Sequence, residues 1–481
     1  MQTILISGIC FLAGIILIVL IIPTKKRRKG DKREKKDFFT LSAEGKRLIF
    51  RDPFDNFLIY AGANSGKTKS IGKPILKEYL RTNFAGFVYD YKDDDLSKTV
   101  YHFHQKFAVK YPLYHISFTE PSKSHRTNPI SPKLITDENL FIQVIDDFYA
   151  AYADNDRPDE WYKGAVGILR GIAINFYYLY PDFCTIPHIV QFTCSAGAKR
   201  ITEFLKRTQR SRALASGFID AQDSPKTQSS FLSSLTNPLS ILTLNKNIAW
   251  VLTGDDFDFN LIDPQNPKIL TISNSFQKEN VIGPVISLML TVSTRQFTLS
   301  NQVEFFYFLD EATTFKIVDF EKLPSVLREY KCSFTFITQS GSKVERRYSK
   351  LERSSIEANF GNQFYGKTTD VEALKNYPLV FGKAENRKIS RTSGSSSGRV
   401  SESKTVSTLK EERYDSNFFT RLTAGEFVGI AANANLRDFH LYFDLYDSKK
   451  EGETDLPTVR AVIPQDVEKN YDKIISDVET I

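Results

Sequence analysis

The stretch that decides the fold is Ala61–Thr68, which reads AGANSGKT. It matches the pattern of a phosphate-binding P-loop, a small residue followed after four positions by Gly-Lys-Thr. The apolar run FLIY (Phe57–Tyr60) comes directly before it, and the residues from Lys67 onward (KTKSIGKPILKEYL) place apolar side chains at helical spacing. A strand, a turn and a helix are therefore expected, which is the structural setting that a P-loop needs.

The residue types of this loop suit a bound triphosphate. Small residues let backbone N–H groups curl around the phosphates, and the start of a helix favours negative charge. Lys67 is expected to reach the β- and γ-phosphates, and the Thr68 hydroxyl to ligate magnesium. The alternative is an ordinary glycine-containing turn between a strand and a helix. The predicted cofactors are ATP and Mg²⁺, and the predicted nucleotide-binding residues are Ala61, Gly62, Ala63, Asn64, Ser65, Gly66, Lys67 and Thr68.

An acidic pair follows a second apolar run. Phe305–Leu309 leads directly into Asp310 and Glu311, which is the Walker B arrangement. A buried strand would deliver Asp310 to the magnesium shell, and Glu311 is placed to polarise the attacking water. With the P-loop, this pair predicts an enzyme that hydrolyses ATP.

Two further candidates accompany the next apolar run, Ser333–Ile337. Gln339, at the end of that strand, would sit level with the γ-phosphate and sense its presence. Arg328 lies eleven residues earlier. Its guanidinium could reach the ATP of a neighbouring subunit and neutralise charge in the transition state. The other interpretation of Arg328 is a solvated cation at the end of a helix.

The order of expected elements predicts an α/β fold, a RecA-like P-loop nucleotide-binding domain with a mostly parallel sheet. Residues 38–135 would form its first part and residues 246–450 its second. Apolar residues at helical spacing predict an all-α insertion at 136–245. Residues 385–415, with SGSSSG at the centre, are expected to be a mobile Ser-rich loop, and 451–481 a polar C-terminal tail.

The N-terminal residues 1–37 predict a membrane anchor. Ile4–Ile22 carries no charge and would reach about 28 Å as a helix, close to the thickness of a bilayer core. The basic run Lys25–Lys29 follows at once, which predicts a single transmembrane helix with the bulk of the chain in the cytoplasm. The alternative, a cleaved signal peptide, expects its basic residues before the apolar stretch.

Charge and cysteine content narrow the function classes. The net charge is +7, but nine Lys/Arg against three Asp/Glu between Lys25 and Asp37 supply +6 of it. The basic character therefore belongs to one segment and does not by itself indicate a nucleic-acid-binding body. The four cysteines are irregularly spaced and form no CxxC pair, so neither a disulfide framework nor a zinc site is indicated.

The series of motifs resembles that of the type IV secretion coupling proteins, the TraG/TraD-type ATPases of conjugative DNA transfer. The resemblance covers residues 40 to 450 and rests on the order of the motifs. Tyr91 stands where the family usually has proline. The matching motifs are the P-loop, Asp90-Tyr91-Lys92-Asp93, Asn128-Pro129-Ile130, the helical region around Trp161, Asp310-Glu311-Ala312, Thr338-Gln339-Ser340 and Leu422–Phe427.

The resemblance implies a homo-hexameric ring with ATP held between subunits. It further implies a bacterial inner-membrane location and a substrate-recognition role for the all-α insertion. The implied partners are single-stranded DNA carried by a relaxase, accessory proteins and components of the secretion channel. Lys67, Thr68, Asp310 and Glu311 carry over directly, Gln339 as the sensor and Arg328 as the arginine acting across the interface.

Alternatives stay open at this point. The chain could transport protein effectors without DNA, or it could be an ATP-gated membrane adaptor that transports nothing. A basic cluster after Ser340 could face a ring channel and follow DNA phosphates, or it could belong to an exposed helix interspersed with Glu345 and Glu352. The cluster consists of Lys343, Arg346, Arg347, Lys350 and Arg353.

Overall fold

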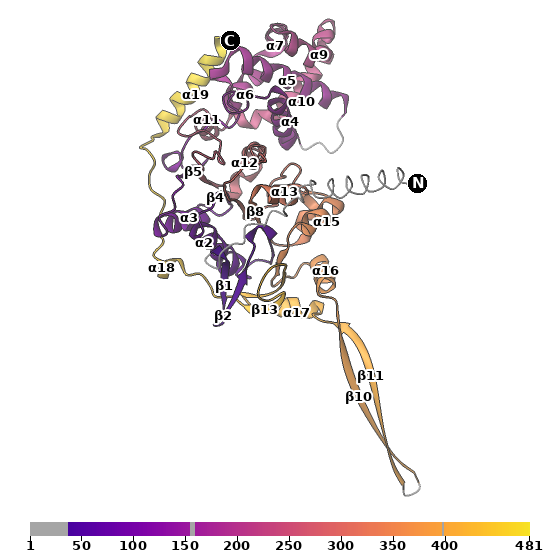
Figure 1. The fold of residues 1–481 in the computed structure, drawn as a ribbon. Helices are drawn as coiled ribbons and strands as arrows, with labels where there is room; N and C mark the ends of the chain where they lie inside the picture. Colours follow the sequence, from indigo (N-terminus) through magenta and orange to yellow (C-terminus); the bar gives the residue numbers. More distant parts are fainter. Residues whose placement is uncertain (1–36, 154–158, 397–398) are drawn as a thin grey trace, which may run out of the picture. The chain divides into compact units, whose positions relative to one another are not determined.

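The computed structural model describes residues 37–153, 159–396 and 399–481 (Figure 1). The chain divides into two units, Met1–Phe38 and Phe39–Ile481, and the second holds all the helices and strands named below. The predicted membrane segment Ile4–Ile22 and the basic run after it lie outside the described residues. Within the described ranges, every helix is too short or too polar to traverse a bilayer.

A nine-stranded sheet forms the centre of the second unit, in the order β13-β12-β9-β3-β8-β7-β4-β6-β5. The seven strands from β9 to β5 pair in parallel, whereas β12 is antiparallel to both β9 and β13. The expected α/β class with a mostly parallel sheet is therefore confirmed. The strands are β3 (Phe57–Tyr60), β4 (Ala85–Asp90), β5 (Leu113–Ser117), β6 (Ile269–Ser273), β7 (Phe305–Leu309), β8 (Cys332–Thr338), β9 (Asn362–Tyr365), β12 (Glu426–Ala431) and β13 (Asp438–Tyr442).

Both faces of the sheet are buried, which explains why its central strands are apolar throughout. In β7, Phe306 stacks on Tyr79 of α2 (Lys73–Arg81), with ring centroids 4.4 Å apart. The next residue along the strand points to the opposite face, where the Tyr307 hydroxyl lies 2.9 Å from Ser293 Oγ of α12 (Glu279–Thr294). Helix α3 (Asp95–Lys106) and the hairpin of β1 (Phe39–Ala43) and β2 (Lys46–Phe50) share the apolar core of the α2 face.

Between β5 and β6, every named element in the described residues is a helix, and this stretch includes the predicted all-α insertion at 136–245. Their apolar residues share one core with α12 and with the face of the sheet to which Tyr307 points. Asp159 caps α5 by accepting a hydrogen bond from Tyr162 N, and Thr185 caps α6 in the same way. The helices are α4 (Glu138–Ala153), α5 (Glu160–Leu179), α6 (Ile186–Ser195), α7 (Gly197–Leu205), α8 (Gln209–Leu214), α9 (Ser216–Asp220), α10 (Pro225–Thr243) and α11 (Lys246–Leu252).

The C-terminal residues return to this helical region. The segment predicted as a polar tail, 451–481, contains α19 (Pro464–Glu479), and the short helix α18 (Ser448–Glu451) comes just before it. Helix α19 packs against α6 and α11 and buries Ile474 and Val478 (Figure 1). The sequence interpretation missed this helix because its few apolar residues, three or four positions apart, are outnumbered by charged ones.

The region predicted as a mobile Ser-rich loop, 385–415, is instead mostly a hairpin. Strand β10 (Lys383–Ser396) pairs antiparallel with β11 (Arg399–Glu412), and the hairpin extends from α16 (Val371–Phe381) and α17 (Ser416–Arg421) (Figure 1). The expectation was wrong because serine content outweighed the β-branched residues, which favour extended backbone. Two of them, Ile389 and Val406, are direct cross-strand partners.

Candidate active site

The P-loop follows β3 at the carboxyl edge of the sheet, as expected. Ala61 N donates to Thr338 O (3.3 Å), and Gly62 N donates to Lys367 O (2.8 Å), so the end of β8 and the segment just after β9 hold the start of the loop. The loop runs into a π-helical turn at Lys67–Gly72, which continues as α2. Such π-helical turns are frequent at functional sites.

Gly66 is required by its backbone and by its neighbours. Its φ of 86° lies in the left-handed region, and an added Cβ would lie 2.9 Å from Gly425 N. Gly425 N in turn donates to Ser65 O at 2.9 Å. The segment before β12 therefore supports the P-loop from one side. Sequence analysis quoted Leu422–Phe427 only as part of a motif series and assigned it no role at this site.

Two predicted site residues, Lys67 and Gln339, contact the same carboxylate oxygen of a third, Glu311. Lys67 Nζ lies 2.5 Å from Glu311 Oε1, and Gln339 Nε2 donates to the same oxygen at 3.3 Å. Lys67 and Glu311 are both buried. They follow β3 and β7, and Gln339 follows β8, so the parallel register brings all three to the same edge. Glu311 has a φ of 44°, a conformation that costs energy for a residue with a side chain.

Asp310 is buried beside this pair, and both of its carboxylate oxygens lack a hydrogen-bond partner among the described residues. Burial and the adjacent Glu311 charge raise the pKa of Asp310 to about 7, against the opposing effect of Lys92 and Lys67. An unpartnered buried carboxylate requires an explanation, and a divalent cation supplies one.

The expected Mg²⁺ ligands fit this site. Thr68 is buried, like Asp310. No group of three or more His, Cys, Asp or Glu side chains suited to a metal occurs in the ranges that the structure describes. That agrees with the usual binding of Mg²⁺ through one or two protein ligands together with substrate phosphates and water.

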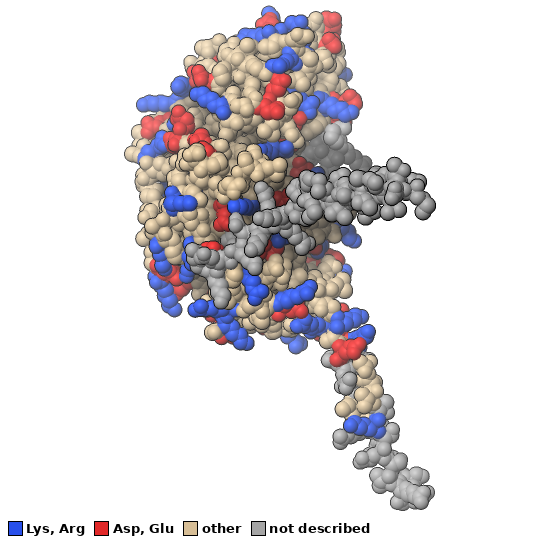
Figure 2. Space-filling view, in the orientation of Figure 1, with Lys and Arg blue, Asp and Glu red and all other residues tan. Residues whose placement is uncertain are grey.

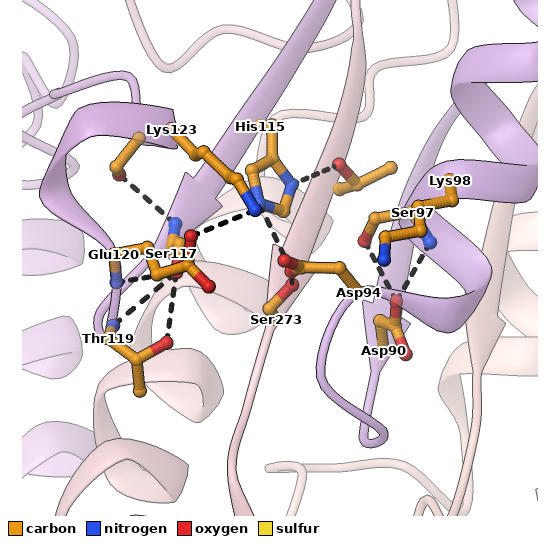
Figure 3. A network of polar contacts seen from close by, with 12 residues as sticks. Asp90, Asp94, Ser97, Lys98, His115, Ser117, Thr119, Glu120, Lys123 and Ser273 are labelled. Carbon is orange, nitrogen blue, oxygen red and sulfur yellow. Dashed lines mark hydrogen bonds and ion pairs between the residues drawn. The ribbon is translucent and has the colours of Figure 1, made fainter. Parts of the chain in front are cut away.

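A polar network continues along the same edge of the sheet, at the ends of β4, β6 and β5 (Figure 3). Asp90, the last residue of β4, accepts hydrogen bonds from Ser97 N (2.8 Å), Ser97 Oγ (2.9 Å) and Lys92 N (3.1 Å). These bonds fix the turn that carries Lys92, whose charge opposes the raised pKa of Asp310.

The second half of the network is centred on Asp94, which accepts a short hydrogen bond from Ser273 Oγ and lies 3.4 Å from His115 Nε2 (Figure 3). His115 Nδ1 is 2.8 Å from Thr271 Oγ1. Asp94, Ser273 and His115 were not among the predicted site residues, since no sequence pattern joins positions so far apart. The network ties together β4, β6 and β5, of which β4 pairs with β7, the strand that leads into Asp310.

Arg328 lies at the opposite, amino-terminal edge of the sheet. Its guanidinium contacts Asp55 Oδ1 at 2.6 Å and Asp52 Oδ2 at 3.3 Å, just before β3. Arg328 is therefore not brought to the P-loop of its own chain. Its assignment as an arginine that acts on a neighbouring subunit stays a prediction.

Comparisons with known proteins agree with this architecture. Plasmid coupling protein TrwB in complex with ADP and Mg²⁺ superposes with a TM-score of 0.66 at 15% identity, covering 89% of this chain and 91% of that one. TrwB with the ATP analogue ADPNP gives 0.63 at 16% identity, covering 89% and 92%. VirB4 of Thermoanaerobacter pseudethanolicus gives 0.52 at 12% identity, covering 86% and 97%. At these identities the likeness establishes the fold alone.

No curated protein matches the chain. The family model described as Type IV secretory system Conjugative DNA transfer matches residues 20–413, which includes the P-loop, Asp310, Glu311 and Gln339. That match spans most of the sequence, and the resemblance read from the order of motifs is confirmed. The chain belongs to the type IV secretory system conjugative DNA transfer family.

Proposed function

We propose that this chain is a membrane-anchored ATPase that couples ATP hydrolysis to the translocation of DNA, or of a relaxase–DNA complex, into a type IV secretion channel. It acts as a homo-hexamer at the bacterial inner membrane, with Ile4–Ile22 as its transmembrane helix. The observation that carries the proposal is the meeting of Lys67, Asp310, Glu311 and Gln339 at one edge of the sheet, in a member of this family. The ADP–Mg²⁺ and ADPNP complexes of TrwB support the choice of ATP and Mg²⁺.

The residues divide the work of hydrolysis between them. Backbone N–H groups of the P-loop and Lys67 would bind the phosphates, and Thr68 and Asp310 would hold the magnesium ion. Bound Mg²⁺ neutralises charge on the phosphate oxygens. The phosphates compete with Glu311 for the Lys67 ammonium, and a released Glu311 can accept a hydrogen bond from the attacking water. Gln339 contacts Glu311, which supports its proposed role as the sensor of the γ-phosphate.

The surface offers a candidate path for DNA on α14 (Gly341–Arg347) and at the start of α15 (Lys350–Ala358). Of the predicted basic cluster, Arg353 pairs with Glu345 and Glu357. Lys343, Arg346 and Lys350 are exposed and have no polar partner within the described part of the chain. Elsewhere Figure 2 shows Lys and Arg interspersed with Asp and Glu on the face drawn. We propose that these three cations contact DNA phosphates.

The test is ATP turnover by the full-length chain with and without single-stranded DNA. Stimulation by DNA that disappears in Lys67→Ala supports the proposed function. Robust turnover that is indifferent to DNA would instead indicate transport of protein effectors. ATP binding without turnover would indicate an adaptor that uses nucleotide only as a switch.

A further inference from the structure

One short helix, α14, is connected at both ends to the catalytic residues. It begins directly after Gln339 and Ser340, and Gln339 Nε2 donates to Glu311 Oε1 at 3.3 Å. Ser340 Oγ and Ser342 Oγ donate to the two carboxylate oxygens of Asp370, at 2.8 and 2.9 Å. The amino end of α14 is thereby fixed beside the predicted sensor.

The carboxyl end of α14 holds the segment that follows Glu311. Arg347 Nε donates to Thr313 O at 3.1 Å, and Arg347 Nη2 donates to Thr314 O at 3.2 Å. Thr314 N donates back to Glu311 O at 3.0 Å, which closes the turn after the catalytic acid. A planar guanidinium with donors in a fixed fork is suited to two successive carbonyl oxygens.

Tyr348, the residue after α14, adds a second attachment to the same segment. Its buried hydroxyl accepts a hydrogen bond from Ile317 N at 3.1 Å. Three hydrogen bonds therefore tie the backbone from Thr313 to Ile317 to the carboxyl end of α14. Glu311, at the start of this segment, has a left-handed backbone conformation that its surroundings must maintain.

We propose that Arg347 is a positioning residue that transmits DNA binding on α14 to Glu311. The inference rests on the proposed function, because it takes the exposed Lys343 and Arg346 of the same helix as DNA contacts. When single-stranded DNA binds these cations, α14 shifts. The guanidinium of Arg347 then transmits that shift to the backbone after Glu311. Arg347 belongs to the basic cluster predicted from sequence, yet two of its donors serve the protein backbone.

The experiment measures DNA affinity and DNA-stimulated ATP turnover separately, in the full-length chain with single-stranded DNA. Arg347→Ala is expected to keep the dissociation constant for DNA within about twofold, while the ratio of stimulated to basal kcat falls by at least about fivefold, the lower range for coupling between sites. Arg347→Lys keeps the charge but not the fork, and should show the same loss. Arg346→Ala should instead weaken DNA binding, with stimulation recovered at saturating DNA.

Arg413→Ala serves as the matched control, because Arg413 is an exposed arginine whose side chain pairs with Asp438 and lies over the ring of Tyr414. Thermal unfolding checks that each variant is folded. If Arg347→Ala loses DNA affinity and recovers stimulation at saturating DNA, Arg347 is a phosphate contact and the inference is wrong. Full stimulation in Arg347→Lys or Arg347→Ala also overturns it. A wild-type chain that hydrolyses ATP without responding to DNA overturns the proposed DNA function as well.

Discussion

Lys67 and Glu311 form a buried ion pair, with the ammonium nitrogen 2.5 Å from Oε1. Lys67 is the predicted phosphate ligand and Glu311 the residue predicted to polarise the attacking water, so each functional group is engaged by the other. We expect ATP binding to draw Lys67 toward the phosphates and to leave Glu311 available to water. In this hypothesis the pair links phosphate binding to the availability of the Glu311 carboxylate.

Replacing the acid should separate binding from hydrolysis. Glu311→Gln is expected to lower ATP turnover by about 10²–10⁴-fold, the range for losing a positioned acid–base group. ATP affinity should be kept or increase, because Lys67 no longer has a carboxylate partner. Phosphate release and titration with a fluorescent ATP analogue measure the two quantities. Glu372→Gln, at an exposed helix position, is the control. Loss of ATP affinity comparable with that of Lys67→Ala would contradict this prediction.

Two glycines with positive φ allow backbone strain to be distinguished from steric collision of an added Cβ. Gly66→Ala should destabilise the chain and abolish ATP binding, because the new Cβ meets Gly425 N at 2.9 Å. Gly45→Ala carries a similar backbone penalty, roughly 1–2 kcal/mol for a left-handed residue, but meets no atom within 4 Å. Gly45→Ala should therefore lower the Tm modestly and leave ATP binding intact. Equal effects of the two substitutions on ATP binding would disprove the role assigned to Gly425.

Asp310 makes stability depend on pH in a defined direction. Because its folded-state pKa is raised from 3.8 to about 7, the folded chain binds a proton over this range that the unfolded chain releases. Folding stability contributed by this group therefore falls as the pH rises from about 4 to about 7. Asp310→Asn should raise the Tm most above pH 7 and least near pH 4. Thermal unfolding of both proteins in chelator, without nucleotide, measures this Tm difference. A gain in Tm that does not depend on pH would contradict the prediction.

Arg328 can be tested for two roles at once. Arg328→Ala leaves the buried Asp55 without its 2.6 Å partner, so the Tm should fall. The double variant Asp55→Asn/Arg328→Ala removes the unpaired charge and should recover the Tm. If Arg328 acts on a neighbouring ATP, turnover stays about 10³–10⁵-fold low in both variants.

Mixed assemblies complete the test of Arg328. Subunits with Arg328→Ala and subunits with Lys67→Ala should restore some turnover when combined, since each supplies what the other lacks at a shared interface. Turnover recovered by the double variant alone would show that Arg328 only neutralises Asp55.

The sequence predicted the parts of the site that are local or follow from strand order. The P-loop is contiguous, and Asp310, Glu311 and Gln339 each follow an apolar run that became a central parallel strand. Because the carboxyl ends of such strands share an edge, their meeting was predictable. The family resemblance, based on the order of these motifs, is confirmed by the match to residues 20–413.

Contacts that depend on distant backbone were not predictable. Gly425 approaches Ser65 only because β12 joins the sheet through β9, and Arg347 finds its carbonyl partners only once β7 and β8 are paired. The hairpin β10–β11 was missed because its serine content was given more weight than its β-branched residues. In each case the deciding information is a register between strands, which composition and motif spacing do not contain.

The return of α19 to the helical region has a consequence for synthesis on the ribosome. The residues of α6 and α11 are translated long before Pro464–Glu479, which cover Ile474 and Val478 against them. Domains generally begin to fold from the N-terminus as they emerge. The apolar surface of the helical region that α19 covers must therefore stay uncovered until Pro464–Glu479 have been translated. A premature stop shortly before Pro464 would leave an intact catalytic sequence joined to an unfinished helical region.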